Sequence, residues 1–209
     1  MREPRNKVVQ VRRFGGPDEL AVVEAPLPTA GRGEVRVRVL ASGLEYTDVV
    51  IRRHLYPQTM RRRPPFVLGY DVVGQIDQLG DGVRGFQLGD WVADMTVVGS
   101  NAAYRTLRSS DLTRVPAGVD AAEAATLILS WTTAYQLLHR AARAQPGQRV
   151  LVQGAAGAVG QALLVLGRVG RPGAVGHRAR RSRSADPRTG RHANRLPARR
   201  LHARPARRV

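Results

Sequence analysis

The sequence predicts a small β-barrel over residues 1–120, the beginning of a doubly wound α/β domain over residues 121–170, and an Arg-rich tail over residues 171–209. Three observations support this fold class, which is mixed α+β and α/β. Short β-type segments separated by Gly and Asp turns fill the first part, and a helical spacing of apolar residues begins at Asp120. A glycine-rich run, GAAGAVG, then follows a buried apolar segment.

The first 120 residues are expected to form half-buried strands. KVVQVRRFG, from Lys7 to Gly15, alternates apolar and polar residues and runs into the turn GGPD, and AVVEAPLP follows as an edge-type strand ended by prolines. Val35, Val37 and Val39 in GEVRVRVLASG fall on one face of a third strand, with arginines on the other face. Further short segments of the same kind, FVLGYDVVGQIDQLG, GVRGFQLGDWVADM and AAYRTLRSSDLTRVP, complete the pattern of a small barrel.

The pattern changes to helix at Asp120. DAAEAATLILSWTTAYQLLHRAA has apolar residues spaced by three and four, an acidic start and a basic end, and PGQ ends it. RVLVQGAAGAVGQALLVLGRVG then reads as a buried strand, a glycine turn and a helix. We therefore expect linking helices and the first strand, turn and helix of a second domain in residues 121–170.

Composition limits the size and class of the protein. A length of 209 residues with 43% hydrophobic content suits one good-sized domain, or one domain and a fragment. The chain has no apolar stretch of the roughly 18 residues that a membrane span requires and no apolar signal-peptide core at its start, so we expect a cytoplasmic protein without a membrane partner. The absence of cysteine excludes disulfides, thiolate zinc sites and cysteine nucleophiles.

The net charge of +18 lies mainly in the tail. Residues 171–209 contain thirteen arginines and a single acid, Asp186, which assigns +12 of the total to the tail. The tail has no aromatic residue, no isoleucine and no periodicity, so we expect it to be disordered. Such an arm could bind nucleic acid non-specifically, but it lacks the aromatic residues on which bases stack.

The run GAAGAVG carries the strongest chemical signal. After a strand, Gly154 permits a tight turn, Gly157 lets a pyrophosphate approach the backbone, and Gly160 lets helix and strand pack closely. The N-terminus of the following helix adds partial positive charge for the phosphates. The alternative interpretation is that small residues merely allow the helix to pack on the strand.

Successive segments of the chain resemble the quinone-oxidoreductase-like branch of the medium-chain dehydrogenases/reductases. These are GEVRVRVLASGLEYTDVVIRR, HLYP, PFVLGYDVVGQIDQLGDGVRGFQLGDWVA, LSWTTAYQLLH and PGQRVLVQGAAGAVGQALL, in the order of the family and between about Lys7 and Val169. The resemblance implies a GroES-like barrel, then a Rossmann domain, with NADPH or NADH as cofactor and a quinone or enone as hydride acceptor. It also implies a homodimer, expected for an intact full-length form.

Two positions differ from the zinc-containing relatives. Glu45 stands where they carry a cysteine, and Tyr70 and Asp71 stand where they carry a His-Glu pair. The cysteine-rich lobe of the family is also missing, so we expect no zinc. Catalysis would then depend on placing the nicotinamide beside the acceptor and on hydrogen bonds that polarise the acceptor oxygen.

The resemblance also implies a set of site residues. Tyr46, Asp48 and Tyr56 match positions that line the substrate cleft, although Glu45 replaces the common asparagine of the branch. Thr133 matches a threonine near the nicotinamide. The remaining cofactor-binding candidates belong to the glycine turn, namely Gly154, Ala155, Gly157, Ala158, Val159 and Gly160. For the tyrosines, barrel packing with a satisfied hydroxyl is an equal alternative, and for Thr133 an ordinary helix hydroxyl.

The tail contains traces of the family in a neighbouring reading frame. Codons for TGRHANRLP, residues 189–197, can be chosen so that a one-base shift reads LGATPIDY, which resembles a stretch after the second Rossmann strand. VGHRA, residues 175–179, can likewise yield WGTA, like the end of that strand. We therefore expect a one-base frameshift near residues 169–172, and an incomplete cofactor domain without turnover in the chain as printed.

Overall fold

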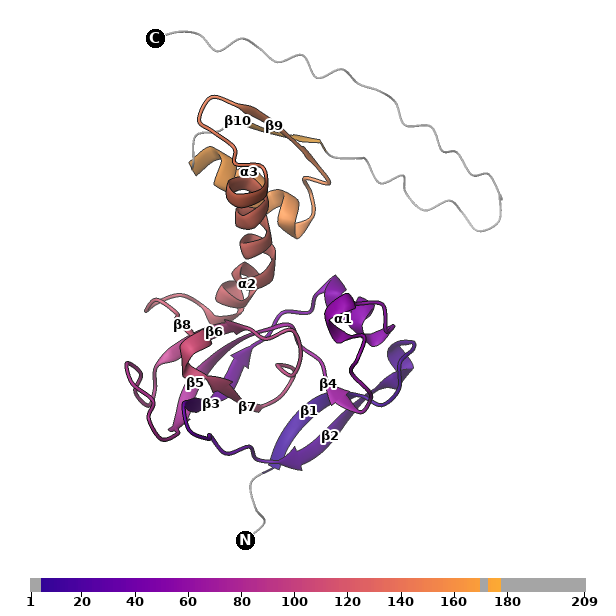
Figure 1. The fold of residues 1–209 in the computed structure, drawn as a ribbon, viewed down its shortest axis with the longest axis vertical. Coiled ribbons are helices and arrows are strands. Elements are labelled where there is room, and N and C mark those ends of the chain that lie inside the picture. The colour runs from indigo at the N-terminus through magenta and orange to yellow at the C-terminus, as the bar shows by residue number, and fades with distance from the viewer. Residues whose placement is uncertain (1–4, 170–172, 178–209) are drawn as a thin grey trace, which may run out of the picture. The chain divides into compact units, whose positions relative to one another are not determined.

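The computed structural model of the chain describes residues 5–169 and 173–177. Its first part is built from two antiparallel sheets (Figure 1). The smaller sheet has the strand order β2–β1–β4, and the larger has the order β7–β3–β5–β6–β8. The strands of the smaller sheet are β1 (Arg5–Val11), β2 (Leu20–Pro26) and β4 (Phe66–Val67). Those of the larger are β3 (Glu34–Ala41), β5 (Asp71–Leu79), β6 (Trp91–Met95), β7 (Tyr104–Arg108) and β8 (Thr113–Arg114).

The alternation of apolar residues in the sequence produces the core of this barrel. Val35 and Val37 on β3 are fully buried, as the period of two predicts, while Val39 is partly buried. They pack in one cluster with apolar side chains from the neighbouring strands: Val72, Ile76, Val92 and Leu107. A second cluster joins β1 to the segment that leads into β5, and includes Val11, Ile51, Phe66, Leu68, Tyr70 and Val98. The barrel therefore has its own closed apolar interior.

A short helix, α1 (Tyr46–Arg52), was not predicted from the sequence. Its residues lie in the segment GLEYTDVVIR, to which the sequence pattern assigned no element. The Asp48 side chain accepts a hydrogen bond from the N–H of Glu45, three residues earlier, with a distance of 2.9 Å between Oδ2 and N. Such a contact satisfies a donor at the start of a helix, and it explains why the helix begins here.

The predicted linking helices form a single helical segment. The helix α2 (Ala121–Tyr135) begins at Asp120, whose side chain accepts hydrogen bonds from the N–H groups of Ala122 and Glu123. It continues without a break into the π-helix η4 (Gln136–Ala141). We expected more than one helix; a single one forms because the sequence has no Gly or Pro between Ala121 and Gln145 to interrupt it. Its first turns pack on the barrel through Ala124 and Ala125.

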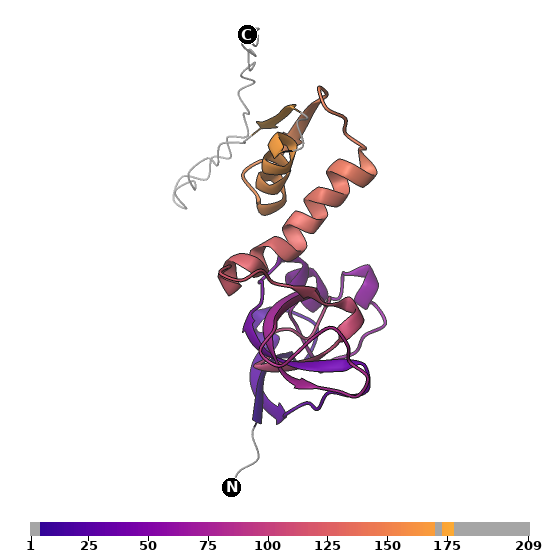
Figure 2. The ribbon, with the colours of Figure 1, turned by 90° about the vertical axis from the view of Figure 1, so that its left-hand side faces the viewer.

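The glycine-rich region forms the predicted strand, turn and helix. The strand β9 (Arg149–Gln153) leads into α3 (Ala158–Val169), and a further strand, β10 (Gly173–His177), lies parallel to β9 (Figure 2). We expected no regular element after residue 170, so β10 corrects that expectation for these five residues. Parallel strands pair through backbone hydrogen bonds, and the edge of β9 supplies the partner groups. Residues 173–177 can therefore form a strand although their side chains show no periodicity. The predicted disorder of residues 178–209 lies outside the described residues.

No helix in the described part of the chain is both long and apolar enough to span a bilayer.

Candidate functional site

The glycine turn between β9 and α3 has the geometry that its sequence predicts. Gly154 has a φ of +66°, a left-handed conformation that glycine adopts without a steric penalty. A Cβ atom on Gly160 would lie 2.4 Å from the carbonyl oxygen of Gly154 and 2.7 Å from the Cα of Ala155. Because no real Cβ atom tolerates such distances, Gly160 is required for helix and turn to approach each other.

The start of α3 presents backbone donors to solvent. The N–H of Gly157 donates to the carbonyl of Gly154 at 2.9 Å, which closes the turn, and the carbonyl of Gly157 accepts the N–H of Gln161. The first-turn N–H groups of Ala158, Val159 and Gly160 have no partner within a helix. Gly157 and Ala158 are exposed. This end of α3 therefore combines free donors, the positive end of a helix dipole and an open approach, which suits a phosphate group.

The predicted threonine lies in the last turn of α2. Thr133 is partly buried, and its carbonyl accepts a hydrogen bond from the N–H of Gln136. Among the described residues, no hydrogen bond of its side-chain hydroxyl is found. Its role beside a nicotinamide stays a prediction.

The three residues predicted to line the substrate cleft differ in exposure. Tyr46, the first residue of α1, is 79% exposed. Asp48 is 2% exposed, and its second carboxylate oxygen accepts the N–H of Gly69 at 3.2 Å. Both oxygens of Asp48 thus bind backbone donors at the start of α1 and before β5. Asp48 therefore positions these two segments, whereas Tyr46 is open to a ligand.

Tyr56 forms a pair with Tyr70. Their hydroxyl oxygens are 2.7 Å apart, and their rings meet edge to face with centroids 6.0 Å apart. Burial raises the pKa of the Tyr70 hydroxyl well above its usual range, and the hydrogen bond with Tyr56 acts in the same direction. One hydroxyl donates to the other, so the pair keeps one further O–H that can donate to a third group. For Tyr56, the sequence left two interpretations open, packing in the barrel and a role in the substrate pocket. The pair with Tyr70 is compatible with both.

A buried carboxylate, Asp71, directly follows Tyr70 in the chain and begins β5. It is fully buried, and its Oδ1 accepts the N–H of Gly43 at 2.6 Å, while Oδ2 has no partner among the described residues. Burial raises the pKa of Asp71. The hydrogen bond from the Gly43 N–H lowers this pKa, and the charge of the neighbouring Asp48 raises it. Burial also raises the pKa of Glu45, with Asp71 and Asp48 contributing. Burial raises the pKa of Asp48 as well, and the hydrogen bonds that it accepts from the N–H groups of Glu45 and Gly69 act in the opposite direction.

The positions that hold zinc in some relatives of the sequence do not form a metal site in this chain. In the described part of the chain, no group of three or more His, Cys, Asp or Glu side chains is placed to hold a metal ion. Tyr70 and Asp71 instead make the contacts given above, with Tyr56 and with Gly43. The donor set does not fit zinc, and zinc independence stays a prediction.

The structure brings some of the predicted residues together and adds others. Tyr56, Asp48 and Glu45 belong to one region on the barrel, and the glycine turn with its cofactor candidates forms a separate region. Sequence reasoning missed Tyr70 as the partner of Tyr56 and Asp71 as a buried carboxylate, because both were considered only as replaced zinc ligands. The segment LGYDVV offered a signal, since two polar residues precede a run of buried valines.

Comparison with known proteins identifies the barrel. A family model described as the alcohol dehydrogenase GroES-like domain matches residues 31–126. Quinone oxidoreductase from Lama guanicoe is 33% identical over 166 residues, which are 78% of this chain and 49% of that protein. The human synaptic vesicle membrane protein VAT-1 homolog-like is 32% identical over 162 residues, or 77% of this chain and 38% of that protein.

Solved structures give the same result for the fold. The structure of the human VAT-1 homolog-like protein superposes with a TM-score of 0.78 at 28% identity, covering 83% of this chain and 56% of that one. A mycobacterial protein solved in complex with NADPH has a TM-score of 0.73 at 31% identity, covering 82% of this chain and 52% of that one. The chain spans between 38% and 49% of the length of the two curated relatives named above.

Proposed function

Because the chain belongs to the quinone-oxidoreductase-like medium-chain dehydrogenases/reductases, we propose that its function is that of an NADPH-dependent oxidoreductase. Such an enzyme would reduce a quinone or an enone without zinc. NADH is the alternative cofactor. The turn from Gly154 to Gly160 is the observation that carries the proposal. Gly154 has a left-handed conformation, Gly160 leaves no room for a side chain, and the start of α3 is exposed. The likeness to a protein solved with NADPH supports the choice of cofactor.

The residues of the turn would hold the pyrophosphate of the cofactor. The first-turn N–H groups of α3 donate to phosphate oxygens, and the positive end of the helix favours the negative charge. Gly157 leaves the approach open, since it carries no side chain and is exposed. Once bound, the cofactor supplies a hydride from its nicotinamide ring.

The Tyr56–Tyr70 pair is the strongest candidate for polarising the acceptor oxygen. The raised pKa of Tyr70 keeps its proton in place at neutral pH, so the pair retains a hydroxyl donor. Tyr46 offers a second, exposed hydroxyl at the start of α1. Hydrogen bonds from such groups stabilise the negative charge that develops on the acceptor oxygen during hydride transfer. They would take the place of a Lewis-acid metal.

We expect the 209 residues alone to bind the cofactor weakly and not to turn it over. The described part of the second domain has two strands, β9 and β10, and one helix between them. In a doubly wound domain, the ribose contacts and the opposite side of the cofactor crevice come from further strands and loops. The described turn would supply the phosphate contacts, which are a part of the binding energy.

The test is a titration of the full chain with NADPH, followed by the fluorescence of the nicotinamide. Gly157→Ala should weaken binding by about tenfold or more, because its methyl group would hold the pyrophosphate away from the N–H groups of the first turn of α3. Losing one hydrogen bond to a charged group costs about 1.5–3 kcal/mol. A Cβ at this position would meet only the Gly154 carbonyl at 3.4 Å, so the fold of the turn should survive. Gly16→Ala is the matched control, because its Cβ would meet nothing within 4 Å.

Two results would contradict the proposal. Equal NADPH affinity of the Gly157→Ala and Gly16→Ala variants would remove the turn from the binding site. Binding that never saturates would show that the turn has no specific affinity for the cofactor. Oxidation of NADPH by 1,4-benzoquinone, compared with a reaction lacking protein, checks separately that the chain alone does not turn over.

A further inference from the structure

An open cavity of about 370 Å³ lies at the surface of the barrel, and the residues assigned to the reaction do not line it. Its lining comes from β1, β4 and β7, from the loop before β4 and from the residues that follow β2 or precede β7. It includes neither the tyrosine pair nor the glycine turn. Val8, Val67, Val98 and Ala102 form an apolar part of its wall. The cavity is therefore large enough for a small organic molecule and can accept an apolar portion of it.

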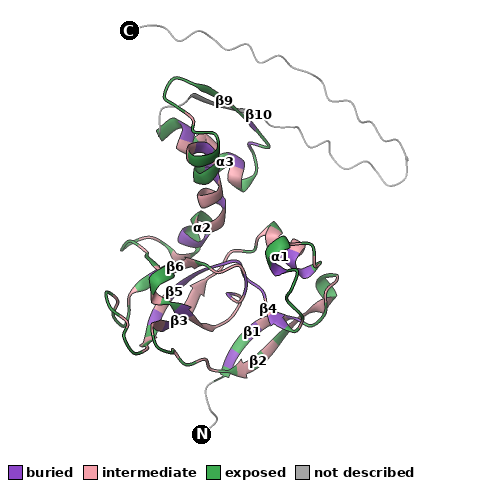
Figure 3. Cartoon of the chain, in the orientation of Figure 1, coloured by how far each residue is buried: buried purple, intermediate pink, exposed green. Residues whose placement is uncertain are grey.

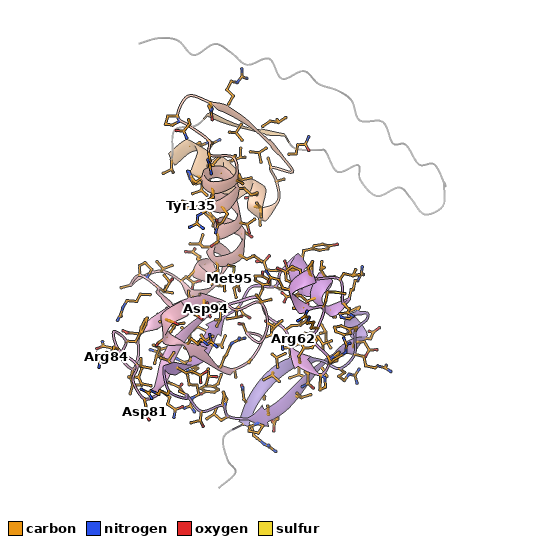
Figure 4. The ribbon with its side chains drawn as sticks, viewed as in Figure 1. Arg62, Asp81, Arg84, Asp94, Met95 and Tyr135 are labelled. Atoms are coloured by element: carbon orange, nitrogen blue, oxygen red, sulfur yellow. The ribbon has the colours of Figure 1, made fainter. Side chains whose placement is uncertain are left out.

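Two arginines line the same cavity. Arg105 on β7 is partly buried, and its guanidinium donates to the carbonyl of Val98 and, at 3.4 Å, to the hydroxyl of Ser100. Arg62, which Figure 4 labels, is exposed and lies in the loop between α1 and β4, with its guanidinium 5.6 Å from the centre of the Phe66 ring. Arg105 is thus held by hydrogen bonds within the barrel, and Arg62 lines the same cavity from the loop before β4.

These charges have no carboxylate partner in direct contact. Among the described residues, no ion pair within 4.0 Å includes Arg62 or Arg105. Burial lowers the pKa of Arg105, Asp94 partly opposes this effect, and Arg62 adds to it. Burial also raises the pKa of Asp94, and Arg105 acts in the opposite direction. Two mutually repelling cations in one partly buried cavity are stabilised by an anion placed between them.

Asn6, a polar residue of the same wall, already has its hydrogen-bond partners. The amide of Asn6 donates to the carbonyl of Tyr104 at 2.8 Å and accepts its N–H at 2.9 Å. It therefore fixes β1 to β7 and leaves recognition of a charged group to the guanidiniums. Guanidinium groups recognise carboxylates through paired N–H donors.

We propose that this cavity binds a small amphipathic carboxylic acid, with its carboxylate between Arg62 and Arg105 and its short apolar chain against Val8, Val67 and Val98. The site is independent of the proposed oxidoreductase chemistry, because none of the residues assigned to that chemistry lines the cavity. It would let an organic acid bind to the barrel without competing with the cofactor.

The test compares two probes, hexanoate and acetate, by isothermal titration calorimetry of the full chain at constant ionic strength. Hexanoate should bind about tenfold more tightly than acetate, because part of its longer chain is removed from water on the apolar wall. Arg62→Gln should weaken hexanoate binding by about tenfold, since it removes one of the two charge-assisted partners. Arg63→Gln is the matched control, with the same change of charge in a neighbouring exposed residue that does not line the cavity.

A second variant addresses the buried arginine. Arg105→Lys keeps the charge but loses the paired donors, and we expect weaker hexanoate binding with an unchanged circular dichroism spectrum. Equal losses in Arg62→Gln and Arg63→Gln would overturn the proposal, because the anion would then be responding to net charge alone. Equal affinities of hexanoate and acetate would overturn it as well, because the apolar wall would have no role.

Discussion

The barrel and the β9–α3–β10 unit differ in how far they bury their own apolar side chains. On the barrel, β3, β5 and β6 each carry fully buried side chains, including Val37, Val72 and Val92. On the second unit, Leu151 of β9 is 67% exposed and Val169 of α3 is 78% exposed. Figure 3 shows β9 and α3 with much of their length in the colour of exposed residues. Both units have regular elements, but only the barrel closes a core around them.

The difference follows from the kind of sheet that each unit builds. An antiparallel barrel buries one face of each strand, so alternating residues suffice. A parallel sheet of a doubly wound domain is covered on both faces, and its strands are apolar throughout, as VLV in β9 is. Among the described residues, no element packs against one face of β9. The barrel should therefore be stable by itself, and the second unit should gain stability from what binds to it.

The largest expected effect is on the barrel core. Ile76→Ala, at a residue 1% exposed, should lower the free energy of unfolding by about 2–5 kcal/mol, because it leaves a cavity in a packed cluster. Leu151→Ala, at an exposed position, should change it by less than about 0.5 kcal/mol. Urea denaturation followed by tryptophan fluorescence measures both. Similar losses for the two variants would mean that β9 belongs to an equally closed core.

The next effect sharpens the comparison inside the second unit. Gly160→Ala should destabilise the packing of α3 on the turn by about 1–3 kcal/mol, because its Cβ would collide with the Gly154 carbonyl. The barrel should remain folded. Limited trypsin proteolysis should therefore show faster cleavage at Arg168, with the fragment covering the barrel preserved. Unchanged cleavage at Arg168 would show that the turn tolerates a side chain here.

The pH dependence of stability tests the buried carboxylate of the barrel. Since burial raises the pKa of Asp71, the folded chain retains a proton that the unfolded chain has released. The free energy of unfolding should therefore fall as the pH rises from the ordinary pKa of an aspartate through the raised one. Asp71→Asn should flatten this fall, and Asp81→Asn, at an exposed loop position, should leave it unchanged. An equally steep fall in the Asp71→Asn variant would show that Asp71 is not its source.

The smallest effect concerns the tyrosine pair. Tyr56→Phe removes one hydrogen bond between partly buried hydroxyls, and should lower the free energy of unfolding by about 1 kcal/mol. Tyr46→Phe, at an exposed hydroxyl, should have no measurable effect on stability. Chemical denaturation of the two variants under one condition gives the comparison. A loss in Tyr46→Phe as large as in Tyr56→Phe would exclude the pair as the cause.

The part of the structure that depends on local pattern could be predicted from the sequence. Alternation placed Val35 and Val37 in the core, and the glycine spacing located the turn and the start of α3. The helix α1 was missed because its start depends on a side-chain contact of Asp48 rather than on periodicity. The strand β10 was missed because its pairing is supplied by β9.

The candidate site divides in the same way. The glycine turn is a contiguous motif, so its geometry follows from its residues. The partners of Tyr56 and Asp71 come from segments 14 and 28 residues away in the chain, and no local pattern reveals such contacts. The cavity with Arg62 and Arg105 likewise arises when β7 and a loop before β4 come together.

Hydrogen exchange of the backbone amides, with and without NADPH, tests the central comparison most directly. We predict slow exchange in β3 and β5 under both conditions, and faster exchange in β9 and α3 that slows when NADPH is added. Equal protection of the two units, with no change in α3 on addition of NADPH, would contradict both the unequal cores and the proposed cofactor turn.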